Sequence, residues 1–497
     1  MTSLDPSPVG LRRPVWAADP KVLRTEVLAG LVVALALVPE AISFSILAGV
    51  DPRVGLFASF TMAVTIAFTG GRPAMISAAT GAVALVVAPL VTQHGLGHLV
   101  AAVVLGGLMQ IALALLGVAR LMRFLPRSVM VGFVNALAVL IFAAQLPHLV
   151  GVTWVVYPLV LLGLVIIYGL PRVTGAVPSP LVAIVVLTTL TVAAAVAVPT
   201  VGDEGELPDS LPQFGLPDVP FSLETLRIIA PYALALALVG LIESLMTAKL
   251  VDDITDTRSD KTRESWGQGV ANVVTGFFGG MGGCAMIGQT MINVKQSGAR
   301  TRLSTFLAGV FLLVLVVVLG DVVALIPMAA LVAVMVLVAV STFDWHSVAP
   351  ATLRRMPRSE TAVMVVTVAV VVATHDLAYG VGAGVLTAMV LFARRVAHLV
   401  EVTSVTSPDG TEVVYAVAGQ VFFASSNDLV HQFDYAHDPD SVVIDMAAAH
   451  VWDASSVAAL DAVTTRYERR GKTVRIVGMN AHSAAMHGRL AGQLGGH

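Results

Sequence analysis

The sequence predicts a polytopic α-helical membrane protein that ends in a small α/β domain. Three observations predict this fold class. Of its 497 residues, 57% are hydrophobic and only 12% are charged, a composition far from that of a soluble domain. Apolar runs recur from about residue 24 to about residue 396, and each needs about 20 residues to cross a bilayer. Beyond that point the runs become short and β-branched, as strands are.

Residues 1–23 are expected to form a cytoplasmic N-terminal segment. Arg12, Arg13, Lys21 and Arg24 precede the first apolar run, as cations precede the core of a signal peptide. Because many further runs follow, we interpret this one as an uncleaved first helix.

The first membrane repeat is expected to span residues 24–198. Its first run, Val27 to Ala48, contains Pro39 followed by Glu40. An ionisable group at this depth is costly and indicates function. The alternatives are a structural carboxyl and a proline kink without a functional role. The other runs of this half lie at about 52–70, 76–92, 96–117, 128–147, 154–170 and 179–198.

Residues 199–224 are expected to form an external linker, because they are acidic, rich in proline and free of Lys and Arg. The second repeat is expected at residues 225–396. Its runs lie at about 228–248, 265–279, 286–294, 303–320, 324–341, 360–374 and 378–393. This makes about fourteen spans, two of them short, in two groups of about seven.

The positive charges gather in alternate loops, as they do where those loops are cytoplasmic. Seven spans per half make the halves start on opposite sides of the membrane, which is typical of an inverted repeat. Both termini are then expected in the cytoplasm. The cations that support this topology are Arg72, Arg120, Arg123, Arg127, Arg172, Lys249, Arg258, Lys261, Arg263, Lys295, Arg300, Arg302, Arg354, Arg355, Arg358, Arg394 and Arg395.

Two glycine-rich stretches interrupt the apolar runs. Gly279–Gln289 is about half glycine, and Gly70–Gly81 shares its opening Gly-Gly and an Ala-Met-Ile triplet. Broken backbone at membrane depth is tolerated where protein buries it or where it lines a watery cavity. Interrupted segments in both halves point to the binding site of a secondary transporter. The alternatives are a chance match and glycines that serve only close helix packing.

Two short helices are expected to begin near Thr80-Gly81 and Gly288-Gln289. A helix N-terminus carries unpaired N–H groups and about half a positive charge, so two that face each other can hold an anion without Lys or Arg. The substrate is therefore expected to be an anion. The predicted backbone donors are Gly81, Ala82, Met286, Ile287 and Gly288. The candidate neutral ligands, with packing as the alternative role, are Thr80, Thr247 and Gln289.

Each half carries an intramembrane carboxyl in its first span, Glu40 and Glu243. A carboxyl that takes up a proton as an anion enters can couple transport to the proton gradient. A purely structural carboxyl is the alternative for each.

Other features point away from other functions. The dispersed cations argue against nucleic-acid binding. Cys284 is the one cysteine, which excludes an intramolecular disulfide and a cysteine-built metal site, and we interpret it as a small apolar filler. His148 and His375 are interpreted as interfacial structure. A solvated charge run is the interpretation of Asp252, Asp253, Asp256 and Asp260 with Arg258, Lys261 and Arg263.

Residues 397–497 are expected to form a cytoplasmic α/β domain. Glu412–Ala424, Ser441–Met446 and Thr473–Met479 have the composition of strands. Ser455–Arg470 has apolar positions at helical spacing and a cationic end.

The chain resembles a known family in three regions. One runs through Asp253-Ile254-Thr255-Asp256, Thr262-Arg263-Glu264, Gly267-Gln268-Gly269, Asn272 and Phe278-Gly279-Gly280. Another comprises Leu28-Ala29-Gly30, Val38-Pro39-Glu40-Ala41 and Gly55-Leu56-Phe57-Ala58-Ser59. These regions resemble SulP-type anion transporters, the family of sulfate permeases, bicarbonate transporters and prestin. The C-terminal part is similar to a STAS domain, and the likeness covers essentially the entire chain.

The resemblance implies fourteen spans in two inverted seven-helix repeats, a core domain that moves against a gate domain, and usually a homodimer. It places the substrate pocket between the third and tenth helices. The implied pocket residues are Thr80, Gly81, Ala82, Ala285, Met286, Ile287, Gly288 and Gln289, with Glu243 and Thr247 alongside. Some bacterial members use a first-helix glutamate, here Glu40, for proton coupling.

The sequence also departs from the family. Animal exchangers have Arg where Gln289 falls, so no fixed cation is expected in this pocket. Sodium-coupled bicarbonate members have Asp where Glu243 stands and a more polar start to the tenth helix, which argues against sodium and bicarbonate. Ala454 replaces the serine that is phosphorylated in some STAS domains, so that regulation is not expected.

We therefore expect a proton-coupled anion symporter in the inner, cytoplasmic membrane of a bacterium. It is expected to need no cofactor besides the co-transported proton and not to be an enzyme. Sulfate and small dicarboxylates both fit, with a slight preference for a carboxylate because no fixed Arg is expected. The alternatives are an anion channel or voltage-responsive motor, a chloride/bicarbonate exchanger, and a membrane-tethered sensor. The STAS-like domain is expected to bind a cytoplasmic partner.

Overall fold

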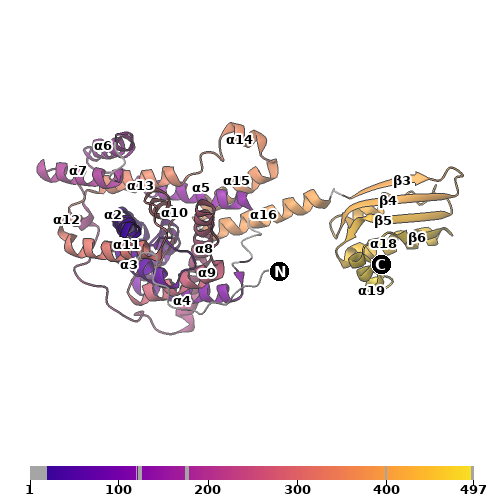
Figure 1. Cartoon of the computed structure of the whole chain (residues 1–497), viewed down its shortest axis with the longest axis horizontal. Helices are drawn as coiled ribbons and strands as arrows, with labels where there is room; N and C mark the ends of the chain where they lie inside the picture. Colours follow the sequence, from indigo (N-terminus) through magenta and orange to yellow (C-terminus); the bar gives the residue numbers. More distant parts are fainter. Residues whose placement is uncertain are drawn as a thin grey trace. The chain divides into compact units, whose positions relative to one another are not determined.

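The computed structural model describes residues 20–118, 120, 126–173, 178–375, 377–397 and 400–493. The chain divides into two compact units, Met1–Val385 and Leu386–His497, whose elements are labelled in Figure 1. The charges predicted at Arg12, Arg13 and Arg123 lie outside the described residues.

Apart from two short strands, the regular elements in the described part of the first unit are helices, and the last of them, Leu377–Ala397, continues past the boundary at Leu386. Its first half contains α2 (Pro20–Ala48), α3 (Pro52–Thr69), α4 (Gly81–Leu115), α5 (Arg127–Ala143), α6 (Val156–Gly169) and α7 (Ser179–Ala193). Its second half contains α8 (Leu223–Thr255), α9 (Lys261–Phe277), α10 (Ile287–Met291), α11 (Arg302–Val318), α12 (Gly320–Ala324), α13 (Met328–Thr342), α14 (Pro350–Arg355), α15 (Arg358–Thr374) and α16 (Leu377–Ala397). Among the described residues, five helical segments are long and apolar enough to span a membrane, namely Pro20–Ala48, Pro52–Thr69, Gly81–Leu115, Arg127–Leu149 and Leu223–Thr255.

The helices lie where the apolar runs predict them, except at the run 324–341 and at the short helix α14, which no run predicted. The runs at 76–92 and 96–117 correspond to the two parts of α4, two helices that meet at a kink at Gly95, where φ is 79° and ψ is −177°. The run at 324–341 starts at the last residue of α12, and α13 begins only after Pro327. A proline fits the first turn of a helix but not its interior, so the chain divides there.

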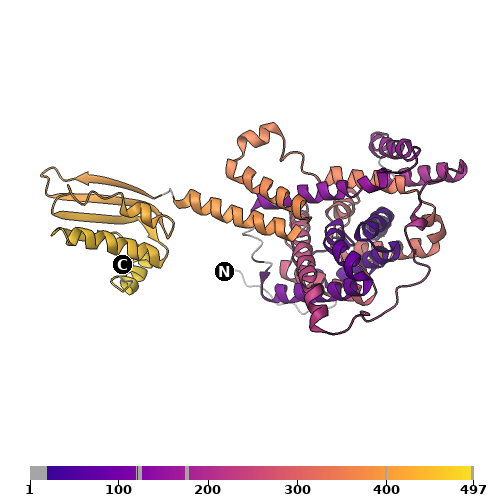
Figure 2. The same ribbon diagram turned by 180° about the vertical axis from the view of Figure 1, so that it is seen from behind.

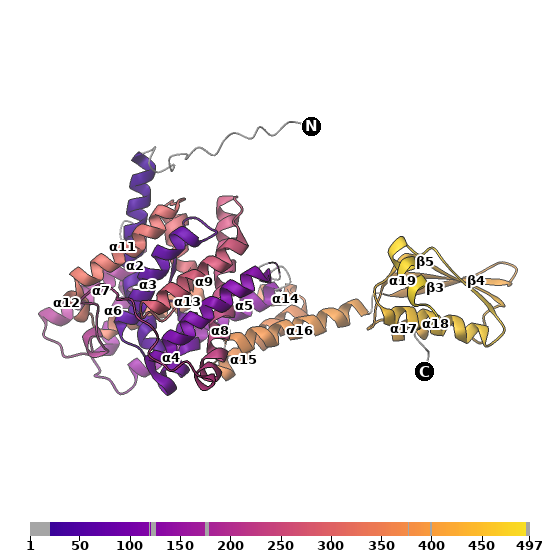
Figure 3. The same ribbon diagram turned by 90° about the horizontal axis from the view of Figure 1, so that it is seen from below.

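Close helix packing forms the centre of this unit. The helix α4 packs along α8 and α9, while α11 packs along α2 and α3. Figure 3 shows α3 between α9 and α11. Where α4 crosses α9, a Cβ at Gly107 would lie 2.6 Å from the carbonyl oxygen of Gly269. Glycine is therefore needed for these backbones to approach so closely.

The two glycine-rich stretches meet in a strand pair that the sequence analysis did not anticipate. Strand β1 (Ser77–Ala78) pairs antiparallel with β2 (Cys284–Ala285). A Cβ at Gly283 would collide with the carbonyl oxygen of Ala78. The pair crosses between the halves of the unit and places the starts of α4 and α10 near each other.

The connection predicted as an acidic linker has little regular structure. Residues 199–222 contain one short 3-10 turn, Val201–Asp203, and otherwise no regular structure before α8. Figure 2 shows this connection at the surface.

The interpretation of the charged residues at the α8–α9 connection as a solvated charge run is wrong for Asp252. Its side chain is only 16% exposed and binds Arg72 at 3.1 Å and Lys261 at 2.7 Å. Asp260 caps α9, accepting from the N–H of Arg263 at 2.9 Å.

The second unit is an α/β domain, which confirms the prediction. Its sheet has the order β3 (Glu401–Thr406), β4 (Glu412–Val421), β5 (Ser441–Val451), β6 (Thr473–Val477). Strands β3 and β4 are antiparallel, and the other two pairs are parallel. The helices are α17 (Ser426–Val430), α18 (Ala454–Glu468) and α19 (Ala481–Leu490). The buried side chains of β4, β5 and α18 form one hydrophobic core.

Candidate functional site

A small cavity lies between the first turns of α4 and α10. Its volume is about 110 Å³, below the several hundred Å³ of a site for a drug-sized ligand. Helices α2, α5, α8 and α13 supply the other walls. The lining residues are Glu40, Phe44, Thr80, Gly81, Phe133, Val134, Leu137, Ile141, Glu243, Met246, Met286, Ile287, Gly288, Val338, Ser341 and Thr342.

The start of α4 supplies one predicted side of the cavity. Thr80 is its N-cap residue and accepts a hydrogen bond from the N–H of Val83 at 3.3 Å. The N–H groups of Gly81 and Ala82 belong to the first turn, which has no intrahelical acceptors. A Cβ at Gly81 would lie 2.9 Å from Cε1 of Phe44, so glycine lets this side chain pack closely against the start of α4. The side chain of Ala82 is buried and does not line the cavity.

The start of α10 supplies the other predicted side. Ile287 and Gly288 are its first two residues, and the helix continues as a π turn over Ile292–Gln296. A Cβ at Gly288 would meet no atom within 4 Å, so this position faces open space.

One predicted backbone donor is not free. The N–H of Met286 donates to the carbonyl oxygen of Ile76 at 2.9 Å, which extends the β1–β2 pairing by one bond. The prediction of this N–H as an anion donor is therefore wrong for this arrangement, although Met286 lines the cavity. Ala285 does not line it, and its N–H donates to Oγ of Ser244 at 3.1 Å.

Glu40 and Gln289 form a side-chain pair across α2 and α10. Nε2 of Gln289 donates to Oε1 of Glu40 at 2.7 Å. Glu40 lines the cavity, whereas Gln289 is 1% exposed and lies behind the cavity wall. Oε1 of Gln289 is buried and has no hydrogen-bond partner among the described residues.

Glu243 is part of a second polar cluster, which corrects the interpretation of Cys284. The thiol of Cys284 donates to Oε2 of Glu243 at 2.8 Å, and its sulfur lies 3.1 Å from Oγ1 of Thr80. The cysteine therefore links the start of α4 to α8 and is not an apolar filler. Thr247 is buried and does not line the cavity. Its hydroxyl donates to the carbonyl oxygen of Glu243 at 2.8 Å.

Sequence reasoning missed the walls from α5 and α13. Phe133, Leu137 and Ile141 repeat at helical spacing on α5, and Ser341 and Thr342 end α13. Apolar residues at helical spacing are common in any packed membrane helix, so only the paired polar residues at the end of α13 carried a usable signal.

The charges around the cavity are distinctive. Among the described lining residues, Glu40 and Glu243 are the ionisable ones, and there is no Lys or Arg. Two helix starts supply partial positive charge. Among the described residues, no group of three or more His, Cys, Asp and Glu side chains could hold a metal ion.

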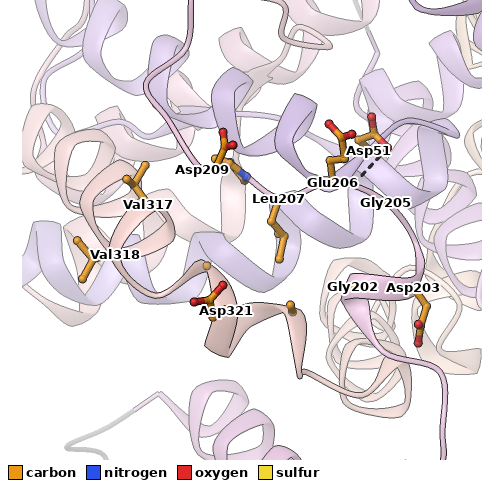
Figure 4. Close-up of a pocket in the computed structure, with 13 residues that line it drawn as sticks. Asp51, Gly202, Asp203, Gly205, Glu206, Leu207, Asp209, Val317, Val318 and Asp321 are labelled. Atoms are coloured by element: carbon orange, nitrogen blue, oxygen red, sulfur yellow. Dashed lines mark hydrogen bonds between the residues drawn. The ribbon is translucent and has the colours of Figure 1, made fainter.

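A larger cavity of about 720 Å³ lies at the linker and the α11–α12 turn (Figure 4). Asp51, Asp203, Glu206, Asp209 and Asp321 line it. Hydrogen bonds from Thr200 lower the pKa of Asp203 below its ordinary value, so this carboxyl is ionised at neutral pH. Such a surface repels an anion, and size alone does not make it the anion site.

Two protein-family models match the chain. The model of the sulfate permease family matches residues 23–158 and 153–367, and the STAS domain model matches residues 402–489. The putative sulfate transporter YbaR of Bacillus subtilis is 55% identical over 469 residues, which cover 94% of this chain and 97% of that protein.

Two solved structures are similar to the chain. The transmembrane domain of the cyanobacterial bicarbonate transporter BicA has a TM-score of 0.64 and 25% identity, over 75% of this chain and 98% of that one. Murine Slc26a9, an anion transporter in the inward-facing state, has a TM-score of 0.79 and 17% identity, over 98% of this chain and 92% of that one. The second likeness supports the fold alone.

Proposed function

Because the chain belongs to the sulfate permease family and ends in a STAS domain, we propose that it is a proton-coupled symporter of a small anion. Its named relatives are transporters and not enzymes. The observation that carries the proposal is a cavity that combines two helix starts with two carboxyls and no cationic side chain among the described residues.

The coupling follows from charge. Two unit charges of the same sign about 4 Å apart repel by about 4 kcal/mol at an effective dielectric constant of about 20. An anion in this cavity therefore binds best when Glu40 is protonated, and a bound anion in turn favours the protonated acid. Because each binding event favours the other, the doubly loaded form predominates over the singly loaded ones, and in this proposal it is the doubly loaded form that changes access.

Sulfate is the substrate that we favour over a dicarboxylate. The cavity of about 110 Å³ suits an ion of few heavy atoms, and a relative at 55% identity is named a putative sulfate transporter. Other relatives are named bicarbonate transporters, so bicarbonate belongs in any substrate panel. A four-carbon dicarboxylate would require the walls from α5 and α13 to move outward.

We also propose alternating access by two inverted repeats of seven spans. The packing of the two halves supports this layout, because α8 and α9 pack on α4 as α2 and α3 pack on α11. In the same way, α15 packs on α5 as α6 packs on α13. We further propose that the protein lies in the bacterial inner membrane with both termini in the cytoplasm, and that it forms a homodimer.

A further part of the proposal is that the coupled ion is a proton and not sodium. Each cavity carboxyl already accepts a hydrogen bond, from Gln289 or from Cys284, which leaves fewer oxygen lone pairs for a cation. Replacing external sodium by choline is expected to leave uptake unchanged.

The test is uptake of labelled sulfate, bicarbonate and succinate into proteoliposomes, with and without an inward proton gradient. Wild-type protein is expected to accumulate sulfate only with the gradient, and a protonophore is expected to abolish accumulation. Glu40→Gln is expected to lose gradient-driven accumulation. Glu224→Gln, which changes an exposed carboxyl in the first turn of α8, serves as the matched control.

The alternatives predict other outcomes. A channel would give wild-type flux that stays uncoupled and equals that of Glu40→Gln. An exchanger would require internal chloride or bicarbonate and would ignore the pH gradient.

A further inference from the structure

We propose that Gln289 is a positioning residue that hydrogen-bonds Glu40 in both of its protonation states and so permits the carboxyl to gain and lose its proton during transport. This inference rests on the proposed proton-coupled function. It assigns to a residue behind the cavity wall a role in the coupling step.

The first support is the chemistry of the pair. A glutamine side chain carries a donor and an acceptor on one amide group. Nε2 of Gln289 donates to Glu40 at 2.7 Å, which suits an ionised carboxylate. After the amide rotates by half a turn, Oε1 can accept the O–H of the protonated acid. One side chain therefore serves both states.

The second support is the unpartnered oxygen of Gln289. The residue is 1% exposed, and its Oε1 has no hydrogen-bond partner among the described residues. A buried acceptor without a partner is costly, and in the observed arrangement Oε1 of Gln289 has no hydrogen-bond donor among the described residues. Protonation of Glu40, together with reversal of the amide, gives Oε1 a donor, and the amide nitrogen then takes the position without a partner.

The third support is the contrast with two other buried glutamates. Glu264 accepts from the backbone N–H groups of Gly71 and Arg72 at 2.8 and 2.9 Å. Glu26 accepts from those of Arg300 and Thr301 at 2.8 and 3.0 Å. A backbone N–H can only donate, and it cannot turn around, so these two carboxyls keep fixed donors that favour the ionised form. Glu264 also accepts from the amide of Gln268, but among the described residues Glu40 has its amide partner without fixed backbone donors beside it.

Few other charges act on Glu40. The cavity walls from α4, α5, α10 and α13 present neutral side chains among the described residues. Glu243 on α8 is the other titratable group that lines the cavity, and Cys284 contacts that carboxyl. The amide of Gln289 is thus the direct partner of Glu40.

The experiment compares Gln289→Met and Gln289→Arg with wild type. Methionine has nearly the same length but neither a donor nor an acceptor, and arginine can only donate. The readout is the ratio of gradient-driven sulfate accumulation to equilibrium sulfate exchange, measured in proteoliposomes from pH 5 to pH 8. Both variants are expected to lower the ratio about tenfold, and Gln289→Arg is expected to make accumulation independent of pH.

The matched control is Gln268→Met. Gln268 is also a buried amide that donates to a buried glutamate, Glu264, at 2.9 Å, but that carboxyl has fixed backbone donors. This variant is expected to lower the melting temperature without changing the ratio or the pH profile.

The outcomes separate the two proposals. If wild-type uptake ignores the proton gradient, the proposed function fails. If wild-type uptake is proton-coupled and Gln289→Met keeps the wild-type ratio and pH profile, the role of Gln289 fails. Melting temperatures in detergent identify a misfolded variant, and Gln289→Arg then decides the question through its pH profile.

Discussion

Single residues decide how much room the cavity has. Gly81 and Gly288 both line it, but only Gly81 is enclosed by neighbouring side chains, Phe44 and Ile141. Gly288 has open space where its side chain would be. A substitution at Gly288 therefore changes the cavity without disturbing the packing around it.

We predict that Gly288→Val weakens anion binding at least tenfold, equivalent to about 1.4 kcal/mol, because the side chain fills the cavity. The measurement is anion affinity by calorimetry, together with the melting temperature in detergent, which should stay near the wild-type value. Gly382→Val on α16 is the control, since a Cβ there also meets no atom within 4 Å. Equal affinities in wild type and Gly288→Val would place the anion elsewhere.

A second residue-scale prediction concerns Cys284. Cys284→Ala removes the donor to the buried Glu243 and is expected to reduce stability by about 1–3 kcal/mol. Cys284→Ser keeps a donor and should recover most of the loss. Thermal unfolding in detergent measures both, and equal losses in the two variants would show that the hydrogen bond is not the cause.

At the scale of elements, the strand pair β1–β2 is the feature that brings the two halves together. Two residues from each half pair in register, Ser77 with Ala285 and Ala78 with Cys284. The helices α4 and α10 begin within three residues of these strands. The geometry of the helix starts thus depends on a backbone contact between segments about two hundred residues apart.

Gly283→Ala is expected to break this contact, because its Cβ would collide with the carbonyl oxygen of Ala78. The loss of stability should be about 3 kcal/mol or more. Gly279→Ala is the comparison, since a Cβ there meets no atom but the φ of 73° is unfavourable, which costs about 1–2 kcal/mol. Size-exclusion profiles and melting temperatures test whether Gly283→Ala loses more stability than Gly279→Ala. A smaller loss in Gly283→Ala would contradict this prediction.

At the scale of the whole molecule, the chain combines a helical membrane unit with an α/β unit that has its own core. In that second unit, the hydroxyls of Tyr415 and Tyr467 both donate to Asp438. Burial raises the pKa of Tyr415 and Tyr467 above the ordinary tyrosine value. Both side chains therefore stay protonated in the folded state at a pH where the unfolded chain loses their protons.

This cluster predicts a pH dependence of stability. Unfolded tyrosines ionise near pH 10, so above that pH the folded unit binds more protons than the unfolded chain, and its stability falls as pH rises. Below about pH 10 the two tyrosines contribute their full stabilisation of the folded unit. Tyr467→Phe should flatten the decline between pH 9 and pH 11 in calorimetric melts of the C-terminal unit. An unchanged slope would show that another group causes the decline.

The sequence by itself determined the helical membrane unit, the α/β domain and the family. Hydropathy and strand composition are local properties, and they located the apolar helices, although the start of α2 and the end of α8 lie seven residues beyond the predicted runs. The glycine-rich stretches identified the two broken segments, and intramembrane carboxyls stand out in an apolar chain, as Glu40 and Glu243 do. Each of these signals is complete within one short stretch of sequence.

Only the tertiary structure decided which atoms meet. It paired β1 with β2, used the N–H of Met286 in that pairing, and buried Asp252 against Arg72. It also placed Cys284 on Glu243 and built two cavity walls from α5 and α13. These contacts join residues far apart in the chain, and their free energy depends on distances and angles that no local pattern encodes.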